Sequence, residues 1–332
     1  MTVVLDDTSL PDDANIEIVN PAGKRTLSHV IHDIDGTHSL IRDWIPVMCL
    51  IIDWAMTSGL DKDFDSDENL GKLPQHAGKE LPEEIERFCI ESAGLSSLTQ
   101  MEYGIRRAVQ EGNIPDIPGL ILTPDVLKNN ADVAGRILKG EERFDDVPEP
   151  LELTDFISER ASRLFLLYEK LLDRMCRDRN TALALKDPEQ FRVPGSLEFI
   201  TYLHFLGLKN YFVTGSVIRK QGGMTEEVQA LGFETGPGKM VERLIGSSLD
   251  KKRPKDEVIE NLLEELTADP CSVLIIGDGR REIMAGVEMG SITMSRLPAD
   301  AHRLREIHID IGTNYIVHDY TDPALKELIR KK

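Results

Sequence analysis

Two aspartates, Asp33 and Asp35, follow a short apolar run and come just before Gly36, in the stretch VIHDIDGT (30–37). Alternate side chains of a strand point to the same face of the sheet, so these two carboxylates are expected side by side. Like charges that close raise the pKa of one carboxyl unless a cation neutralises the pair. The spacing therefore favours a metal site or acid–base chemistry, and the alternative is a solvated turn at a strand end.

The second half of the chain alternates strand and helix patterns, which predicts a parallel sheet with crossover helices. Thr214 and Gly215 follow the apolar run at 211–213, and Asp278 follows the run at 273–276. The carboxyl ends of parallel strands lie at one edge of a sheet, where ligands bind. We therefore expect Thr214 and Asp278 to lie beside Asp33, although they are far apart in the sequence.

The residues between these two regions show a helical pattern with no convincing strand. We predict an α/β core domain of residues 1–40 and 193–332, with a helical domain of residues 41–192 inserted into it. The acidic run at 61–68 resembles the start of a calcium-binding loop. It lacks the glycine and the glutamate that such a loop needs, because Ser66 and Lys72 stand there, and a solvated loop is favoured.

The acidic residues expected at the sheet edge form an oxygen-rich site that suits Mg²⁺: Asp33, Asp35, Asp278 and Glu282. The Thr214 hydroxyl and the backbone N–H groups that follow it suit a phosphate oxygen. A basic cluster at a helix start adds local positive charge, supplied by Lys252, Arg253 or Lys255. One carboxylate could then attack phosphorus while its neighbour moves the proton.

The composition limits the partners of such a site. The net charge of −19 over 332 residues argues against nucleic acid or an anionic membrane as a partner. The four cysteines are scattered without the spacing of a metal site, and no basic signal segment or long apolar span occurs. We expect a cytoplasmic protein that is a monomer or a homodimer.

The motifs in this order resemble the haloacid dehalogenase (HAD) superfamily, in particular its phosphatase-type members. They are DIDGT (33–37), a strand ending in Thr214-Gly215, a basic residue before Pro254, and IIGDGRRE (275–282). The resemblance covers about residues 27–40 and 193–320. It implies a Rossmann-like core with an inserted C1-type helical cap. It also implies Mg²⁺-dependent hydrolysis of the phosphate monoester of a small phosphorylated metabolite through an aspartyl-phosphate.

The resemblance also implies a role for each site residue. Asp33 is the nucleophile, and Asp35 is the general acid/base whose backbone carbonyl also binds Mg²⁺. Thr214 holds the phosphoryl group, and Asp278 binds the metal.

Three positions depart from the family pattern. Arg253 stands where a lysine usually precedes the proline, Glu282 replaces a common aspartate, and His38 stands where an apolar residue is common. His38 could contact the substrate or only pack. A halide-cleaving enzyme is disfavoured because that chemistry does not need Asp35. A phosphomutase or phosphotransferase, and a non-catalytic binding module on the same fold, remain as alternatives.

Overall fold

The chain forms two compact units in a computed structural model that describes residues 2–11, 13–76, 81–218, 222–247 and 255–332. The α/β unit consists of residues Met1–Ile41 and Asn180–Lys332, and the helical unit consists of Arg42–Arg179. The sequence places the second boundary later, at residue 192. The residues from 180 onward belong to the α/β unit because they bond to segment 39–41: the Asn180 side chain donates to the Ile41 carbonyl at 2.7 Å.

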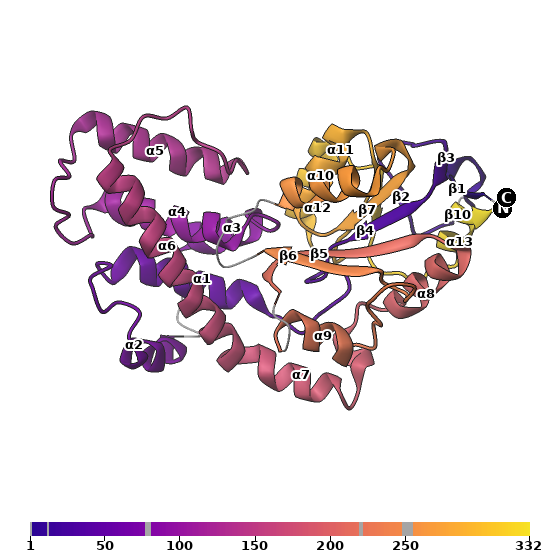
Figure 1. Ribbon diagram of the computed structural model, residues 1–332, viewed down its shortest axis with the longest axis horizontal. Helices are drawn as coiled ribbons and strands as arrows, with labels where there is room; N and C mark the ends of the chain where they lie inside the picture. The colour runs from indigo at the N-terminus through magenta and orange to yellow at the C-terminus, as the bar shows by residue number, and fades with distance from the viewer. Residues whose placement is uncertain (1, 12, 77–80, 219–221, 248–254) are drawn as a thin grey trace. The chain divides into compact units, whose positions relative to one another are not determined.

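A mostly parallel sheet lies at the centre of the α/β unit (Figure 1). Among the described residues it has seven strands, in the order β2-β9-β8-β7-β4-β5-β6. All neighbours are parallel except β2 and β9. The strands are β2 (Glu17–Ile18), β4 (His29–His32), β5 (Lys209–Val217), β6 (Arg243–Ser247), β7 (Val273–Gly277), β8 (Ile292–Arg296) and β9 (Tyr315–Val317). The predicted fold class, a Rossmann-like parallel sheet with an inserted helical part, is confirmed.

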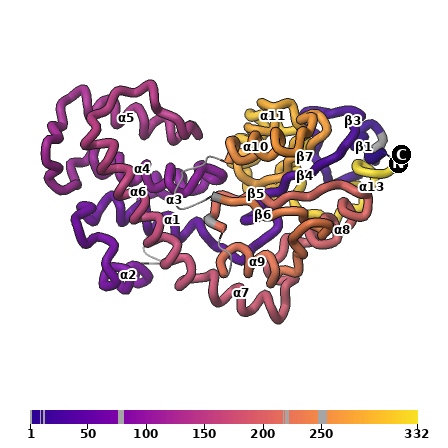
Figure 2. The backbone as a smooth tube through the Cα atoms, in the orientation of Figure 1, coloured from indigo at the N-terminus to yellow at the C-terminus, as the bar shows by residue number. Residues whose placement is uncertain are grey.

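Both faces of the sheet are covered, which explains why its strands read as continuous apolar runs. On β4, Val30 belongs to the core cluster that contains Phe199 of α8, whereas Ile31 belongs to the cluster that contains Ile259 of α10. Figure 2 shows α8 on one side of the sheet and α10 on the other. The described helices that lie around this sheet are η4 (Pro188–Phe191), α8 (Ser196–Leu206), α9 (Met224–Ala230), α10 (Lys255–Leu266), η5 (Pro270–Ser272), α11 (Arg280–Met289), α12 (His302–Ile311) and α13 (Ala324–Leu328).

A small antiparallel sheet joins the two ends of the chain. Among the described residues it has three strands in the order β10-β1-β3, namely β1 (Val3–Asp6), β3 (Lys24–Leu27) and β10 (Ile329–Lys331). The short helix η1 (Asp7–Ser9) follows β1, and the Asp7 carboxylate accepts a hydrogen bond from the Tyr315 hydroxyl at 2.8 Å. This contact fixes the N-terminal segment to β9 of the large sheet.

The helical unit is built around α4, which packs against α1, α5 and α6. Its described helices are α1 (Trp44–Thr57), α2 (Asp67–Lys72), η2 (Leu73–His76), α3 (Glu83–Glu91), α4 (Ser97–Glu111), α5 (Pro124–Leu138), α6 (Leu151–Leu172) and the π-helix η3 (Asp173–Arg177). The boundary between the two units falls within the next helix, α7 (Asp178–Ala184). Thr123 caps the start of α5, where its hydroxyl accepts from the Val126 N–H at 3.3 Å. No helix in the described ranges is long and apolar enough to cross a bilayer.

Helix α8 begins and ends at a glycine with positive φ, and the two positions differ in the space around them. A Cβ on Gly195 (φ +73°) would lie 2.5 Å from the Tyr320 carbonyl carbon, whereas a Cβ on Gly207 (φ +92°) would meet nothing within 4 Å. We predict that Gly195→Ala lowers the free energy of unfolding by roughly 2–5 kcal/mol, because strain and overlap add. Gly207→Ala, the matched control, should cost roughly 1–2 kcal/mol of strain alone. Urea denaturation measures both, and equal losses would contradict the packing at Gly195.

Candidate active site

Asp33 extends the central strand β4 by one residue. Its N–H donates to the Ile276 carbonyl of β7 at 2.8 Å, and the residue is 8% exposed. Asp278 directly follows the neighbouring strand β7. The parallel register of β4 and β7 thus brings these two carboxylates to one edge of the sheet.

Lys255, the first residue of α10, lies between two of the carboxylates. Its Nζ is 2.9 Å from Asp33 Oδ1 and 3.2 Å from Glu282 Oε2. Burial alone would lower the pKa of this lysine, but the negative charges of Asp33 and Glu282 outweigh burial and raise it. Lys255 is therefore a buried ammonium. The rival cations of the sequence prediction, Lys252 and Arg253, lie outside the described residues.

Three carboxylates share this site. Within the described part of the chain, Asp33, Asp278 and Glu282 each offer a ligand atom, and these atoms all lie within 4.8 Å of one another. Burial, together with the charge of Asp33, raises the pKa of Glu282 to about 7, although Lys255 opposes the shift. Burial, Asp33 and Glu282 also raise the pKa of Asp278. Such a set of close oxygen donors with excess negative charge fits a hard divalent cation such as Mg²⁺.

The turn after Asp33 packs directly against Asp278. Gly36 has φ +77°, and a Cβ there would overlap the Asp278 carboxylate. The Thr37 hydroxyl donates to Asp278 Oδ1 at 2.8 Å. Residues 36–37 therefore fix the position of the Asp278 side chain.

Asp35 and Thr214 occupy separate positions at the same edge. Asp35 is partly buried and pairs with Ser39 in an isolated bridge, and its carboxylate is not part of the three-carboxylate group. Thr214 is buried on β5, beside β4, where its hydroxyl accepts from the Ser216 N–H at 3.1 Å. A Cβ on Gly215 would meet nothing within 4 Å, so the backbone there borders open space.

Two residues that the sequence did not single out hold the turn by its carbonyl oxygens. Arg296, at the end of β8, donates from Nη1 to the Gly36 carbonyl at 2.7 Å. The Tyr320 hydroxyl donates to the Thr37 carbonyl at 3.1 Å. No local pattern marks an arginine at a strand end or a tyrosine in a loop as part of a site, so these contacts become visible only in the fold.

A buried polar chain lies beneath the same turn. Asn210 Nδ2 donates to the Met240 carbonyl at 2.9 Å, so its Oδ1 accepts from His32 Nε2 at 3.2 Å. His32 Nδ1 then accepts from His38 Nε2 at 2.9 Å, and His38 Nδ1 accepts from the Ser196 hydroxyl at 2.7 Å. Neither histidine has any exposed surface, so His38 packs beneath the turn and does not contact a substrate from solution.

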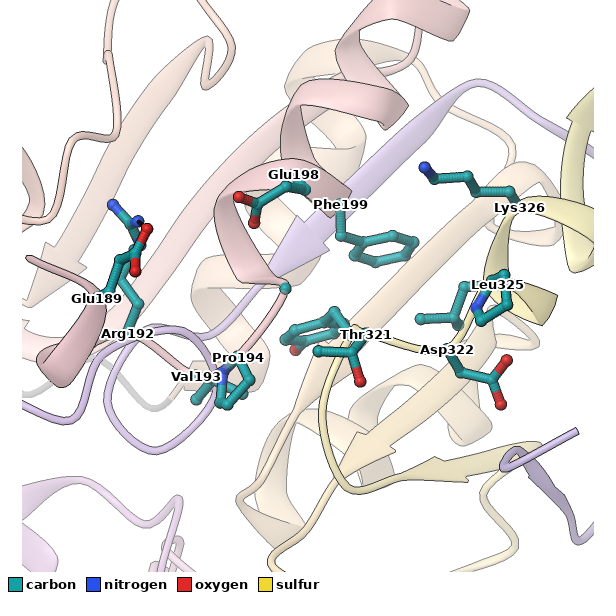
Figure 3. Close-up of a pocket in the computed structure, with 13 residues that line it drawn as sticks. Glu189, Arg192, Val193, Pro194, Glu198, Phe199, Thr321, Asp322, Leu325 and Lys326 are labelled. Atoms are coloured by element: carbon teal, nitrogen blue, oxygen red, sulfur yellow. Dashed lines mark ion pairs between the residues drawn. The ribbon is translucent and has the colours of Figure 1, made fainter.

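A cavity of about 590 Å³ lies elsewhere in the α/β unit, at the start of α8 (Figure 3). Phe199 and Leu325 point into it between charged side chains such as Glu198 and Lys326. Its lining includes Tyr320, but none of the three carboxylates or Lys255. The cavity is therefore separate from the acidic site.

The fold and the site define an α/β protein with an inserted helical unit and a Lys255-bridged acidic cluster at the carboxyl edge of its parallel sheet. No family model matches the sequence, and no curated protein matches it either.

Solved structures similar to this chain include a protein described as a beta-phosphoglucomutase from Bacteroides vulgatus (16% identity, 92% of this chain and 91% of that chain, TM-score 0.49). A phosphonoacetaldehyde hydrolase-like protein from Oleispira antarctica is similar at 16% identity over 95% of each chain, with a TM-score of 0.49. A protein described as a phosphoglycolate phosphatase from Lactobacillus delbrueckii subsp. bulgaricus is 14% identical over 91% of this chain and 96% of that chain, with a TM-score of 0.47.

We predict that Gly36→Ala displaces the Asp278 carboxylate, because the added methyl group needs the space that this carboxylate occupies. Binding of a divalent cation should weaken by about 10–100-fold, the usual effect of disturbing the support of a ligand. Isothermal titration with Mg²⁺ measures the affinity, and circular dichroism checks the fold. Gly290→Ala is the control, because that positive-φ glycine ends α11 in open space. Unchanged Mg²⁺ affinity in Gly36→Ala would contradict the contact with Asp278.

Because His32 and His38 are buried, we predict that the free energy of unfolding falls in acid. Burial lowers the pKa of His32 to about 4 and that of His38 well below its ordinary value, so both stay neutral in the folded state. The unfolded chain takes up protons below about pH 6.5, so stability is full above that pH and is lost as pH falls toward 4. His32 alone accounts for up to about 3 kcal/mol.

Urea denaturation between pH 7.5 and 4.5, with EDTA present, measures this loss. The double variant His32→Phe/His38→Leu should show a shallower decline than the wild type. The control His302→Gln changes an exposed histidine of α12 and should leave the decline unchanged. A double variant with the wild-type decline would show that other groups cause the acid sensitivity.

Proposed function

We propose that the protein is an Mg²⁺-dependent phosphomonoester hydrolase of the HAD type that works through an aspartyl-phosphate on Asp33. The observation that carries this proposal is the group of three carboxylates bridged by the buried Lys255 ammonium, next to the turn that bears Asp35. A nucleophile, a second carboxyl group and a cation then stand at one edge of the sheet, as phosphoryl transfer requires.

Asp33 and Asp35 divide the chemical work in this proposal. A carboxylate oxygen of Asp33 attacks phosphorus, and the bond from phosphorus to the ester oxygen breaks. The carboxyl group of Asp35 gives its proton to the leaving oxygen, and the alcohol departs. Asp35, now a carboxylate, takes a proton from water, whose oxygen attacks the phosphorus of the aspartyl-phosphate. The bond to Asp33 breaks, inorganic phosphate leaves, and Asp35 holds the proton again.

Binding of the phosphoryl group is proposed for residues around this pair. Lys255 contacts Asp33 Oδ1 and so lies beside the attacking group, where its charge offsets that of the phosphate. The buried Thr214 hydroxyl and the backbone N–H of Gly215 offer hydrogen bonds to phosphate oxygens. Arg253 remains a predicted second cation outside the described residues.

Asp33, Asp278 and Glu282 would hold the magnesium ion, with the Asp35 backbone carbonyl as a further proposed ligand. When bound, the ion supplies positive charge that stabilises the transferring phosphoryl group. The Thr37 hydroxyl holds Asp278 in place for this task, and the Gly279 N–H does the same for Glu282 at 2.8 Å.

We propose that the substrate is a small phosphorylated metabolite. A phosphomutase or phosphotransferase would use the same carboxylates, and a binding module would use the fold without turnover. We further propose a monomer or homodimer with no nucleic-acid or membrane partner. The described chain contains free cysteines and no disulfide, which suits a reducing compartment such as the cytoplasm.

Hydrolysis of p-nitrophenyl phosphate tests the proposal. The wild type should release p-nitrophenol with Mg²⁺ and lose this activity in EDTA. Asp33→Asn should lower kcat at least about 1,000-fold, because it removes the nucleophile. Asp310→Asn, which changes an exposed aspartate of α12, should keep wild-type activity. Full activity of Asp33→Asn would contradict the covalent route, and transfer to an added sugar alcohol without release of phosphate would favour the phosphotransferase.

A further inference from the structure

Arg296 is a buried cation that neither the sequence motifs nor the proposed chemistry uses. The residue is 8% exposed and donates from Nη1 to the Gly36 carbonyl at 2.7 Å and from Nε to the His318 carbonyl at 2.9 Å. No carboxylate within the described ranges lies at ion-pair distance from it. A buried guanidinium needs acceptors for its N–H groups, and these two backbone carbonyls provide them.

The carbonyl that Arg296 holds belongs to the peptide that fixes Asp278. Gly36 adopts a left-handed conformation, its Cα faces the Asp278 carboxylate, and the next residue, Thr37, donates its hydroxyl to Asp278 Oδ1. Rotation of the Gly36–Thr37 peptide would therefore move both contacts of Asp278 together. The Arg296 hydrogen bond opposes that rotation directly.

The two carbonyls that Arg296 joins come from segments far apart in the sequence. His318 follows β9, and Gly36 follows β4, while Arg296 ends β8, which pairs with β9. One planar guanidinium at the end of β8 therefore ties the turn after β4 to the segment that follows β9. A lysine at this position carries the same charge, but its single ammonium lacks the rigid fork that reaches two fixed acceptors.

We infer that Arg296 is a positioning residue of the candidate active site, which holds the Gly36–Thr37 peptide and thereby sets the position of Asp278 for metal binding and phosphoryl transfer. Arg296 touches no reacting group in this arrangement and acts through the turn. The inference rests on the proposed function for its catalytic part, whereas its metal-binding part can be measured without turnover.

Arg296→Lys tests the inference in the full-length protein. We expect kcat for p-nitrophenyl phosphate to fall about 10–100-fold and the affinity for Mn²⁺, measured by electron paramagnetic resonance, to fall by a similar factor. KM should change by less than about threefold, because the turn supports Asp278 and not the substrate. Arg192→Lys is the matched control. That arginine also has a side chain only 10% exposed and donates to a backbone carbonyl, that of Leu231 at 2.8 Å. It should retain wild-type kcat and Mn²⁺ affinity.

Chemical rescue separates positioning from general stability. Guanidinium ion at a non-denaturing concentration should restore part of the Mn²⁺ affinity and of kcat to Arg296→Ala, and should have no such effect on Arg192→Ala. Wild-type Mn²⁺ affinity and kcat in Arg296→Lys, with only a lower Tm, would overturn the inference. If the wild type hydrolyses no phosphate ester, the proposed function fails, and the Mn²⁺ affinities of the same variants alone decide whether Arg296 positions Asp278.

Discussion

The ammonium of Lys255 allows three carboxylates to share one edge of the sheet. Two unit charges about 3 Å apart attract by roughly 5 kcal/mol at an effective dielectric constant near 20, and each close pair of carboxylates repels by a comparable amount. One ammonium against Asp33, Asp278 and Glu282 leaves two negative charges when all three are ionised. The site relieves this excess either by taking up protons, as the raised pKa of Glu282 shows, or by binding a divalent cation.

The rest of the α/β unit serves to hold this charged group in place. The strand order places β7 beside β4. Helix α10 begins at Lys255 and packs against the face of the sheet that contains Ile31. Covering both faces of the sheet leaves the carboxyl edge as the place where polar strand ends meet. The turn at Gly36 then closes on Asp278, and bonds from Arg296 and Tyr320 hold that turn.

Much of the fold was predictable because strand and helix periodicity and the polar strand ends are local signals. The parallel sheet and the helical insertion follow from them, as does the choice of Asp33, Asp278 and Glu282. The sequence named Lys252, Arg253 and Lys255 as candidate cations but could not choose among them, because they carry the same charge within four positions. The contact of Lys255 with Asp33 depends on the fold. The contacts of Arg296, His32 and His38 could not be predicted, since they join segments far apart in the sequence. Arg296 bonds to Gly36, and the two histidines bond to Asn210 and Ser196.

A crystal structure of the protein with Mg²⁺ and fluoroberyllate, a mimic of a phosphoryl group on a carboxylate, would test the central claim most directly. The account predicts one metal ion bound by oxygens of Asp33, Asp278 and Glu282, with the beryllium group attached to Asp33 and in contact with Lys255. A metal ion bound away from these carboxylates, or a beryllium group attached to any residue other than Asp33, would contradict it.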